Sequence, residues 1–257
     1  MKKIFILENL DCANCAAKME NAISKLDDVE NVSISFMTTK MVFHGSDIEK
    51  ICDYYHLNKE DIVKFGANVN PLGLSASVKK EIAENIDLFS SYPDRDYVSL
   101  RNTIAAYCQI PAEFILPGNG SSELISLLIQ ERAPKHTLIL GPTYSEYSRE
   151  LSFSGSTQEY YHLREERNFT LDVEDLCKTL ENGYDFLILC NPNNPTSSAI
   201  MQEDLRKLIA FCAEKNIFVM IDETYVEFAP DINAVTAVPL TREFTNLMAV
   251  SYTHLRA

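Results

Sequence analysis

The stretch YDFLILCNPNNPTSS (184–198), followed by QEDLRKLIAFCAEK (202–215) and IFVMIDETYVEF (217–228), decides the fold of this chain. Its first and last parts contain the apolar runs FLILC and FVMI, which are typical of strands buried on both faces of a parallel sheet. The middle part has a helical pattern. A strand, a helix and a second strand in this order indicate an α/β fold with a largely parallel sheet.

The same alternation of helical and strand patterns extends from His44 to Val250. Functional loops of such sheets lie beyond the carboxyl ends of the strands, so polar motifs that follow strands are the candidates for a site. The patterns predict helices over 77–86, 99–108, 121–132 and 202–215, and strands over 136–142, 159–163, 184–192, 217–225 and 246–250.

Composition restricts the possible classes of protein. The 257 residues are 46% apolar and 23% charged, which excludes global disorder. A formal charge of −14 repels phosphate backbones and argues against nucleic acid as a partner. Apolar runs are too short for a membrane span, and the start MKKIFILENL does not resemble a signal peptide. We therefore expect a cytoplasmic protein without a membrane partner.

Two motifs near the middle of the chain have residues that are typical of a ligand-binding site. PGNGSSELISLL (117–128) places Gly120, Ser121 and Ser122 at the start of a helix, where free N–H groups bind anions; a plain capping turn is the alternative. LGPTYSEY (140–147) places Tyr144 after a strand, where its ring either stacks on a planar ligand or packs at the surface.

Two further motifs lie at the ends of the strands predicted over 184–192 and 217–225. LCNPNNPTSS (189–198) offers the amides of Asn193 and Asn194 in a loop that an ordinary Asn/Pro turn also explains. VMIDETYVEF (219–228) ends a buried strand with Asp222 and Glu223. A buried carboxylate is unfavourable unless it is paired, and a protonated heterocyclic nitrogen would supply the opposite charge.

The order and spacing of these four motifs resemble the fold-type I pyridoxal-phosphate enzymes, in the class I and II aminotransferase branch, over about 44–250. This resemblance implies the large domain of that fold, an α/β/α sandwich. The strings at 61–73, 91–107 and 111–123 resemble threonine-phosphate decarboxylases of cobalamin biosynthesis, with histidinol-phosphate aminotransferases as the alternative. The implied substrate is a phosphorylated amino acid, and the implied assembly is a homodimer.

The resemblance also implies roles for single residues around the cofactor pyridoxal 5′-phosphate. Asp222 pairs with the pyridinium nitrogen, and Tyr144 stacks on the ring. Gly120, Ser121 and Ser122 are implied to bind the cofactor phosphate, and Asn194 and Tyr225 to bind the ring 3′-oxygen. Tyr92 is implied to reach the phosphate that a second subunit binds, and Asn70 to lie at the substrate end of the site.

Two departures from that family concern loops after strands. Ser197 stands where the family usually has a glycine after NPNNPT. More seriously, the family needs a lysine that forms a Schiff base with the cofactor. No lysine follows Lys215 in the sequence, and the position expected for the Schiff-base lysine is taken by His254 or a neighbour. The segment SYTHLRA (251–257) does not resemble the family. We therefore assign no catalytic residue and expect an inactive fragment of a truncated or chimeric gene, with a short pseudoenzyme as the alternative.

The first forty residues form a separate pattern. KKIFILEN (2–9) predicts a strand, 16–26 a helix, and 29–36 with 40–45 two more strands, in the order β–α–β–β. Cys12 and Cys15 lie between the first strand and the helix, where their thiolates suit Zn²⁺, Cd²⁺ or Cu⁺. A redox pair or chance spacing would give the same two cysteines.

The string NLDCANCAAKMENAISKLDDVENVSISF (9–36) resembles the heavy-metal-associated domain, which implies a ferredoxin-like metal-binding segment. Asp11 directly precedes the cysteine pair, as in the zinc- and cadmium-binding members of this domain family, where the carboxylate acts as a third ligand. The alternative is that Asp11 is only an acidic residue near the start of a helix. We expect a partial domain over 1–43 without a closing strand, then the larger domain over 44–250 and a tail over 251–257. Segment 1–43 holds five Lys and six Asp or Glu, so it is nearly neutral, unlike the rest.

Overall fold

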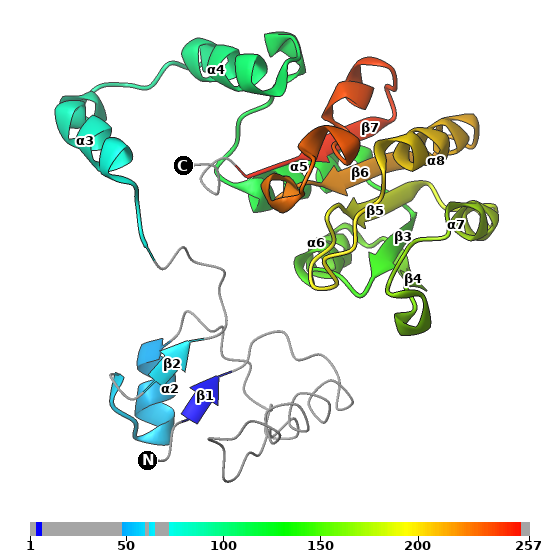
Figure 1. Ribbon diagram of the computed structural model, residues 1–257, viewed down its shortest axis with the longest axis horizontal. Coiled ribbons are helices and arrows are strands. Elements are labelled where there is room, and N and C mark those ends of the chain that lie inside the picture. Colours follow the sequence, from blue (N-terminus) through cyan, green and yellow to red (C-terminus); the bar gives the residue numbers. More distant parts are fainter. Residues whose placement is uncertain (1–3, 7–47, 60–61, 65–71, 253–257) are drawn as a thin grey trace. The chain divides into compact units, whose positions relative to one another are not determined.

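The computed structural model describes residues 4–6, 48–59, 62–64 and 72–252, and it divides the chain into two units, Met1–Ala76 and Ser77–Ala257 (Figure 1). The larger unit is built from a parallel sheet with helices on both faces, which confirms the predicted α/β class. Within the described residues, no helix has both the length and the apolar character that crossing a membrane requires.

The described part of the smaller unit contains two strands and one helix. Strand β1 (Ile4–Ile6) lies within the predicted strand over 2–9, and α2 (Ile48–Tyr55) is the described helix of this unit. Strand β2 (Ile62–Lys64), which was not predicted, pairs in parallel with β1. The helix and strands predicted over 16–45 lie outside the described residues, as do Asp11, Cys12 and Cys15.

The sheet of the larger unit has the strand order β4-β3-β5-β6-β7, and every neighbouring pair is parallel. All five strands were predicted from the sequence, with ends shifted by a few residues. Their bounds are His136–Gly141 (β3), Thr157–His162 (β4), Phe186–Cys190 (β5), Phe218–Asp222 (β6) and Leu247–Val250 (β7).

The register brings the carboxyl ends of the central strands together. Asp222 at the end of β6 lies opposite Cys190 at the end of β5 and Val250 at the end of β7. The loops after β3, β5 and β6, which carry three of the four predicted motifs, therefore leave the sheet at one edge, as expected for parallel strands.

Alternation of side chains along each buried strand produces two hydrophobic cores. On β5, Leu187 and Leu189 belong to one core, whereas Phe186, Ile188 and Cys190 belong to the other. This is the period-two geometry of a strand that is covered on both faces, and it explains why these strands are apolar without interruption.

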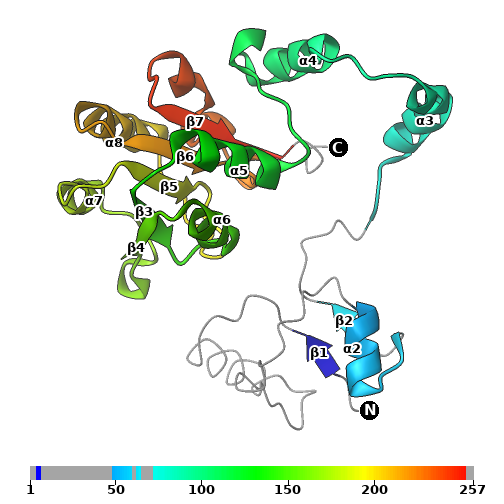
Figure 2. The same ribbon diagram turned by 180° about the vertical axis from the view of Figure 1, so that it is seen from behind.

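Helices α5 (Ser121–Arg132) and α6 (Glu146–Ser154) contribute to the core that contains Ile188. Helices α7 (Val173–Leu180) and α8 (Gln202–Glu214) contribute to the core on the opposite face (Figures 1 and 2). The sequence predicts α5 and α8, whereas α6 and α7 were not predicted. Both are short, with nine residues in α6 and eight in α7, which is less than the window of about 11–18 residues over which a helical period is recognised.

Helices α3 (Ala76–Glu84) and α4 (Val98–Cys108) precede the sheet, and both were predicted. Helix α3 has no buried residue, and α4 buries only Ala105. Two side chains of α4 make hydrogen bonds outside the helix: Arg101 donates twice to the carbonyl of Ala112, at 3.1 and 2.8 Å, and the Tyr107 hydroxyl donates to Glu227 at 2.5 Å.

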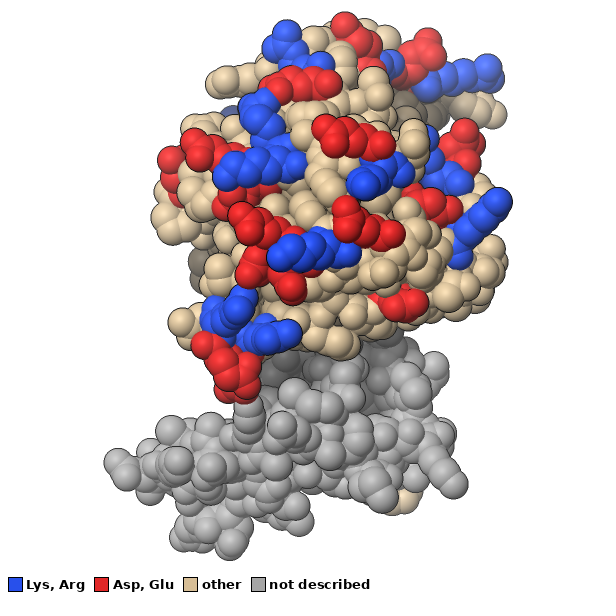
Figure 3. Space-filling view, turned by 90° about the vertical axis from the view of Figure 1, so that its right-hand side faces the viewer, with Lys and Arg blue, Asp and Glu red and all other residues tan. Residues whose placement is uncertain are grey.

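Charged side chains are mixed on the face that Figure 3 shows. Lysines and arginines lie among aspartates and glutamates there, so the net charge of −14 is not gathered into one acidic patch on that face. Among the ion pairs of the described residues, some join neighbours on one helix, such as Arg149 with Glu146 at 2.9 Å. Exposed pairs of this kind contribute about 0–1 kcal/mol each.

Candidate functional site

Asp222 is a buried carboxylate at the end of a central strand, with an exposed fraction of only 4%. Its Oδ2 accepts a hydrogen bond of 2.5 Å from the Tyr147 hydroxyl. Its Oδ1 accepts two, from the Thr224 backbone N–H at 2.9 Å and the Thr224 hydroxyl at 2.7 Å. The carboxylate is therefore held by neutral donors on both oxygens, and its plane is fixed.

Glu223 is the next residue, and its side chain lies on the other face of the sheet. It is fully buried and accepts hydrogen bonds from the Thr236 hydroxyl at 2.8 Å and from the backbone N–H of Ala237. Ala237 belongs to the core that α7 and α8 cover. Glu223 thus attaches the segment around residue 237 to the sheet, and Asp222 alone faces the side where α6 lies.

The start of α5 offers backbone donors. Gly120 is the residue before the first turn, with φ +87° and ψ 167°, and no side chain caps this helix end. That backbone conformation is essentially restricted to glycine. The N–H groups of the first turn have no partner within the helix, and the helix dipole favours negative charge there.

Tyrosines gather between α5 and the end of β6. The Tyr144 and Tyr147 rings meet edge to face, with centroids 5.5 Å apart. Burial raises the pKa of Tyr144, with smaller contributions from nearby groups that include Asp222, Tyr225 and Tyr252. The Tyr252 ring also lies beside Gly120, where an added Cβ would be 3.4 Å from its Cε2 atom. Tyr252 therefore connects the start of α5 with the tyrosines around Asp222.

The loop after β5 is fixed by two asparagines. The Asn191 amide donates to the carbonyls of Ile200 at 3.1 Å and Val235 at 2.8 Å, so it is structural. The Asn193 amide donates to the carbonyl of Pro142, in the loop that carries Tyr144, at 2.9 Å. Asn194 follows in the same loop and is half-buried.

Two buried polar atoms of these loops have no hydrogen-bond partner, namely Asn193 Oδ1 and Thr143 Oγ1. Buried polar atoms are rarely left unpaired unless a water or ligand completes them. Ser197 stands where the family usually has a glycine, and its backbone keeps the conformation that a glycine would favour. Its φ is +58°, in the left-handed region that glycine adopts freely.

The structure brings some of the predicted site residues together and leaves others apart. Asp222, Tyr144, Tyr225 and Gly120 lie around one region, with Ser121 and Ser122 directly after Gly120. Tyr92 is fully exposed and lies outside this cluster. Asn70 and His254 lie outside the described residues.

The sequence analysis missed three residues of this region: Tyr147, Thr224 and Tyr252. Tyr147 ends the motif LGPTYSEY, but its role depends on its place as the second residue of α6. Finding it would have required predicting α6. Nothing in the sequence distinguishes Thr224 or Tyr252 from ordinary loop residues.

Comparison with known proteins gives two family matches. Residues 60–253 match the family described as aminotransferase class I and II. Residues 4–64 match the heavy-metal-associated domain. The second range includes β1, α2 and β2, so it extends beyond the segment 1–43 that the sequence analysis assigned to this domain.

Three relatives illustrate the similarity of the larger unit. A threonine-phosphate decarboxylase of Salmonella typhimurium is 34% identical over 187 residues, which are 73% of this chain and 51% of that protein. A histidinol-phosphate aminotransferase of Methanococcus aeolicus is 29% identical over 73% of this chain and 50% of its own. The crystal structure of the histidinol-phosphate aminotransferase from Clostridium acetobutylicum is similar with a TM-score of 0.64 and 30% identity, over 73% of this chain and 54% of that one. The chain thus spans about half the length of these relatives.

Proposed function

Since the chain belongs to the class I and II aminotransferase family, we propose that its larger unit binds pyridoxal 5′-phosphate at the carboxyl end of the sheet. The observation that carries the proposal is Asp222, a buried carboxylate held by neutral donors at the end of β6. Such a group favours a cation beside it, and the protonated ring nitrogen of the cofactor is one.

The surrounding residues fit the other parts of the cofactor. The start of α5 at Gly120 supplies N–H groups and a dipole for the phosphate, together with the hydroxyls of Ser121 and Ser122. The Tyr144 ring is available for stacking on the pyridine ring. Asn194 and Tyr225 are proposed to bind the 3′-oxygen. The unpaired Asn193 Oδ1 and Thr143 Oγ1 support a ligand or water in this region.

The proposed chemistry depends on the negative charge of Asp222 beside the ring nitrogen of the cofactor. When bound, pyridoxal 5′-phosphate supplies a ring that stabilises negative charge at the substrate carbon. Asp222 holds the proton on the ring nitrogen, and Thr224 with Tyr147 keeps the carboxylate oriented. Tyr144 fixes the ring plane, so that the substrate bond to be broken has a defined direction.

For the whole protein we propose decarboxylation of a phosphorylated amino acid such as threonine phosphate, with transamination of a histidinol-phosphate-like substrate as the alternative. The higher identity to the Salmonella decarboxylase, 34% against 29% for the Methanococcus aminotransferase, supports this order. We also propose a homodimer in which Tyr92 reaches the phosphate of the second subunit, and Asn70 near the substrate. The full exposure of Tyr92 within one chain agrees with a role between subunits.

The first prediction tests the phosphate cradle with 4′-deoxypyridoxine 5′-phosphate, an analogue that has no aldehyde and cannot react with lysines. Gly120→Ala forces a side chain into a conformation that costs about 1–3 kcal/mol. Its Cβ would also contact the Tyr252 ring. We expect at least about fivefold weaker binding of this ligand by calorimetry, because 1 kcal/mol corresponds to about fivefold.

The control for this experiment is Gly155→Ala at the end of α6, where φ is +75° and an added Cβ meets nothing within 4 Å. It should leave the affinity unchanged. Unphosphorylated 4′-deoxypyridoxine should bind wild type more weakly than the phosphate ester. Equal affinities of wild type for the two ligands would remove the phosphate cradle from the proposal.

The second prediction concerns covalent attachment of the cofactor. Lys215, the last lysine of the 257 residues, lies at the end of α8 and before the start of β6, at the edge of the sheet opposite Asp222. With pyridoxal 5′-phosphate and borohydride, we expect no site-specific adduct in the 257-residue chain. His254→Lys should give an adduct at residue 254 that approaches one per chain by peptide mapping. A wild-type adduct that 4′-deoxypyridoxine 5′-phosphate displaces would contradict this prediction.

The third prediction concerns a second function, soft-metal binding by the heavy-metal-associated domain, which the match over 4–64 supports. We propose Cys12 and Cys15 as ligands of Zn²⁺ or Cd²⁺, with Asp11 as a third. Replacing both cysteines by alanine should weaken Cd²⁺ binding more than about 100-fold, since even outer-shell partners contribute 10–100-fold. Cys52→Ala is the control, and equal Cd²⁺ affinity of wild type and the double variant would end this proposal.

A further inference from the structure

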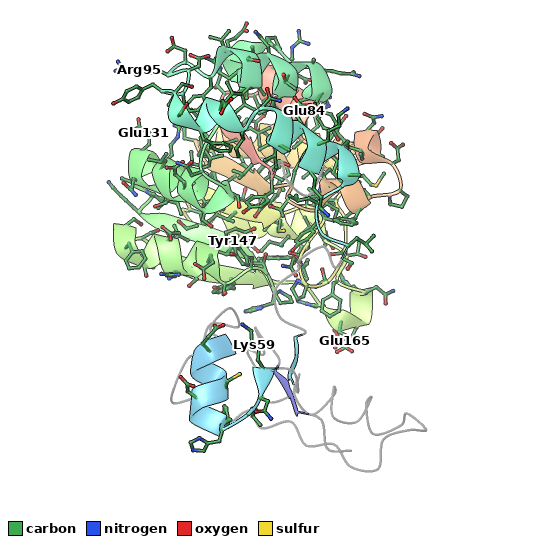
Figure 4. The ribbon with its side chains drawn as sticks, turned by 90° about the vertical axis from the view of Figure 1, so that its left-hand side faces the viewer. Lys59, Glu84, Arg95, Glu131, Tyr147 and Glu165 are labelled. Carbon is green, nitrogen blue, oxygen red and sulfur yellow. The ribbon has the colours of Figure 1, made fainter. Side chains whose placement is uncertain are left out.

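Tyr147 is a fully buried tyrosine whose hydroxyl lies against the carboxylate of the candidate site, beside the thiol of Cys190. It is the second residue of α6, and its exposed fraction is 0% (Figure 4). Its hydroxyl donates to Asp222 Oδ2 at 2.5 Å across 75 positions of sequence. Its ring packs in the core that also contains Ile188 and Met220, so the hydroxyl has little freedom to move.

The hydroxyl stays a neutral donor. Burial and the neighbouring Asp222 raise the pKa of Tyr147 well above its ordinary value. The same causes raise the pKa of the Cys190 thiol, which lies beside Asp222, to about 12. In the described part of the chain, Asp222 forms no ion pair with a lysine, arginine or histidine. Within these residues, the carboxylate of Asp222 is thus held by neutral hydrogen-bond donors.

The two sides of the carboxylate are held from different elements. Thr224, in the loop after β6, occupies Oδ1 with two hydrogen bonds. Tyr147, on α6, occupies Oδ2 with one. Each carboxylate oxygen can accept two hydrogen bonds, so Oδ2 retains one acceptor direction. The donor on α6 therefore determines where that remaining direction points.

We infer that Tyr147 is a positioning residue, which holds Asp222 Oδ2 so that its second lone pair faces the protonated ring nitrogen of the cofactor. This inference rests on the proposed function, because it assigns the orientation of the carboxylate in that same site. Loss of the hydroxyl frees the carboxylate to rotate about its Cβ–Cγ bond, and the pairing with the ring nitrogen weakens.

The test compares two ligands on the full chain. One is 4′-deoxypyridoxine 5′-phosphate, and the other is its analogue with C–H in place of the ring nitrogen. Tyr147→Phe keeps the ring that packs in the core and removes only the hydroxyl. We expect binding of the pyridine ligand to fall about tenfold, because hydrogen bonds to charged groups are worth about 1.5–3 kcal/mol and water replaces part of this one. Binding of the C–H analogue should change less than about twofold.

A spectroscopic measurement accompanies the affinities. The absorption band of the bound pyridine ligand reports whether its nitrogen is protonated. Wild type should show the protonated band at pH 8, and Tyr147→Phe should show a mixture of bands. Tyr147→His restores an N–H donor at this position and should recover part of the protonated band, which a purely structural role of the ring would not produce.

A matched control is Tyr161→Phe on β4. The Tyr161 hydroxyl also donates to a carboxylate, Asp175 Oδ2, at 2.7 Å. Its removal should leave both affinities and the absorption band unchanged.

The possible outcomes separate the two proposals. If wild type binds both ligands equally, the pairing of Asp222 with the ring nitrogen fails, and the proposed function fails with it. If wild type prefers the pyridine ligand and Tyr147→Phe keeps the full preference and the protonated band, the positioning role of Tyr147 is overturned while the proposed function stands. If Tyr147→Phe does not fold, the answer comes from Tyr147→His: a weakened preference with an intact fold supports the inference, and a full wild-type preference with the full protonated band contradicts it.

Discussion

Asp222→Asn is expected to weaken binding of 4′-deoxypyridoxine 5′-phosphate by about 30-fold or more. The substitution keeps the size and shape of the side chain and removes its negative charge. Truncating one partner of a buried charge pair costs about 2–5 kcal/mol, and 2 kcal/mol corresponds to about 30-fold in affinity. The amide also presents an N–H group, which faces a protonated nitrogen unfavourably. Isothermal calorimetry at constant salt measures the loss.

The stability of this variant distinguishes charge from fold. Tyr147 and Thr224 can still donate to the amide oxygen or accept from the amide nitrogen, so we expect the urea midpoint to change little. A variant that binds the ligand as tightly as wild type would show that Asp222 has no role in holding it. A large loss of stability would instead assign Asp222 to the scaffold.

Glu223→Ala, in contrast to Asp222→Asn, is expected to affect stability. Its free energy of unfolding should be lower by about 3 kcal/mol. Its carboxylate is fully buried and accepts from Thr236 and from the Ala237 backbone. Its removal leaves these two donors buried without a partner, and each unsatisfied group costs about 1–3 kcal/mol. It also opens a cavity in the core that contains Leu240. Urea unfolding followed by circular dichroism gives the value.

The isosteric Glu223→Gln serves as its control. Its amide oxygen can accept from Ala237, and its amide nitrogen can donate to the Thr236 hydroxyl, so the loss should be about 1 kcal/mol. Ligand affinity should be unchanged in folded Glu223→Gln. If Glu223→Ala unfolds at the same urea concentration as wild type, the segment around Ala237 does not depend on this carboxylate.

Most of the fold could be predicted from the sequence, since each buried strand is a continuous apolar run. FLILC and FVMI become β5 and β6, at the centre of the sheet. The class I and II aminotransferase family could also be identified from the sequence, because the four motifs occur in a fixed order and three of them follow strands. Helices α6 and α7 escaped prediction because they are only nine and eight residues long, less than the window of about 11–18 residues over which a helical period is recognised.

The candidate site was predictable only in part, because its residues come from distant segments. Gly120, Tyr144, Asp222 and Tyr225 were selected by motif, and the packing of α5, α6 and β6 brings them to one region. The contact of Tyr252 with Gly120 could not be predicted, since it depends on the direction in which the chain leaves β7 toward α5. The hydrogen bond of Tyr147 required α6 to lie on the same face of the sheet as the Asp222 side chain.

The pair Asp222 and Glu223 separates what the sequence determined from what the tertiary structure decided. The sequence determined that two carboxylates end a buried strand, and the period of two along a strand places them on opposite faces. Which face carries the site depends on the helices that cover it. Helix α6 brings Tyr147 to Asp222 and leaves that edge beside Gly120 and the tyrosines, whereas Thr236 and Ala237 enclose Glu223 completely. Two adjacent and chemically similar residues thus differ in role because packing gives one a ligand site and the other a protein partner.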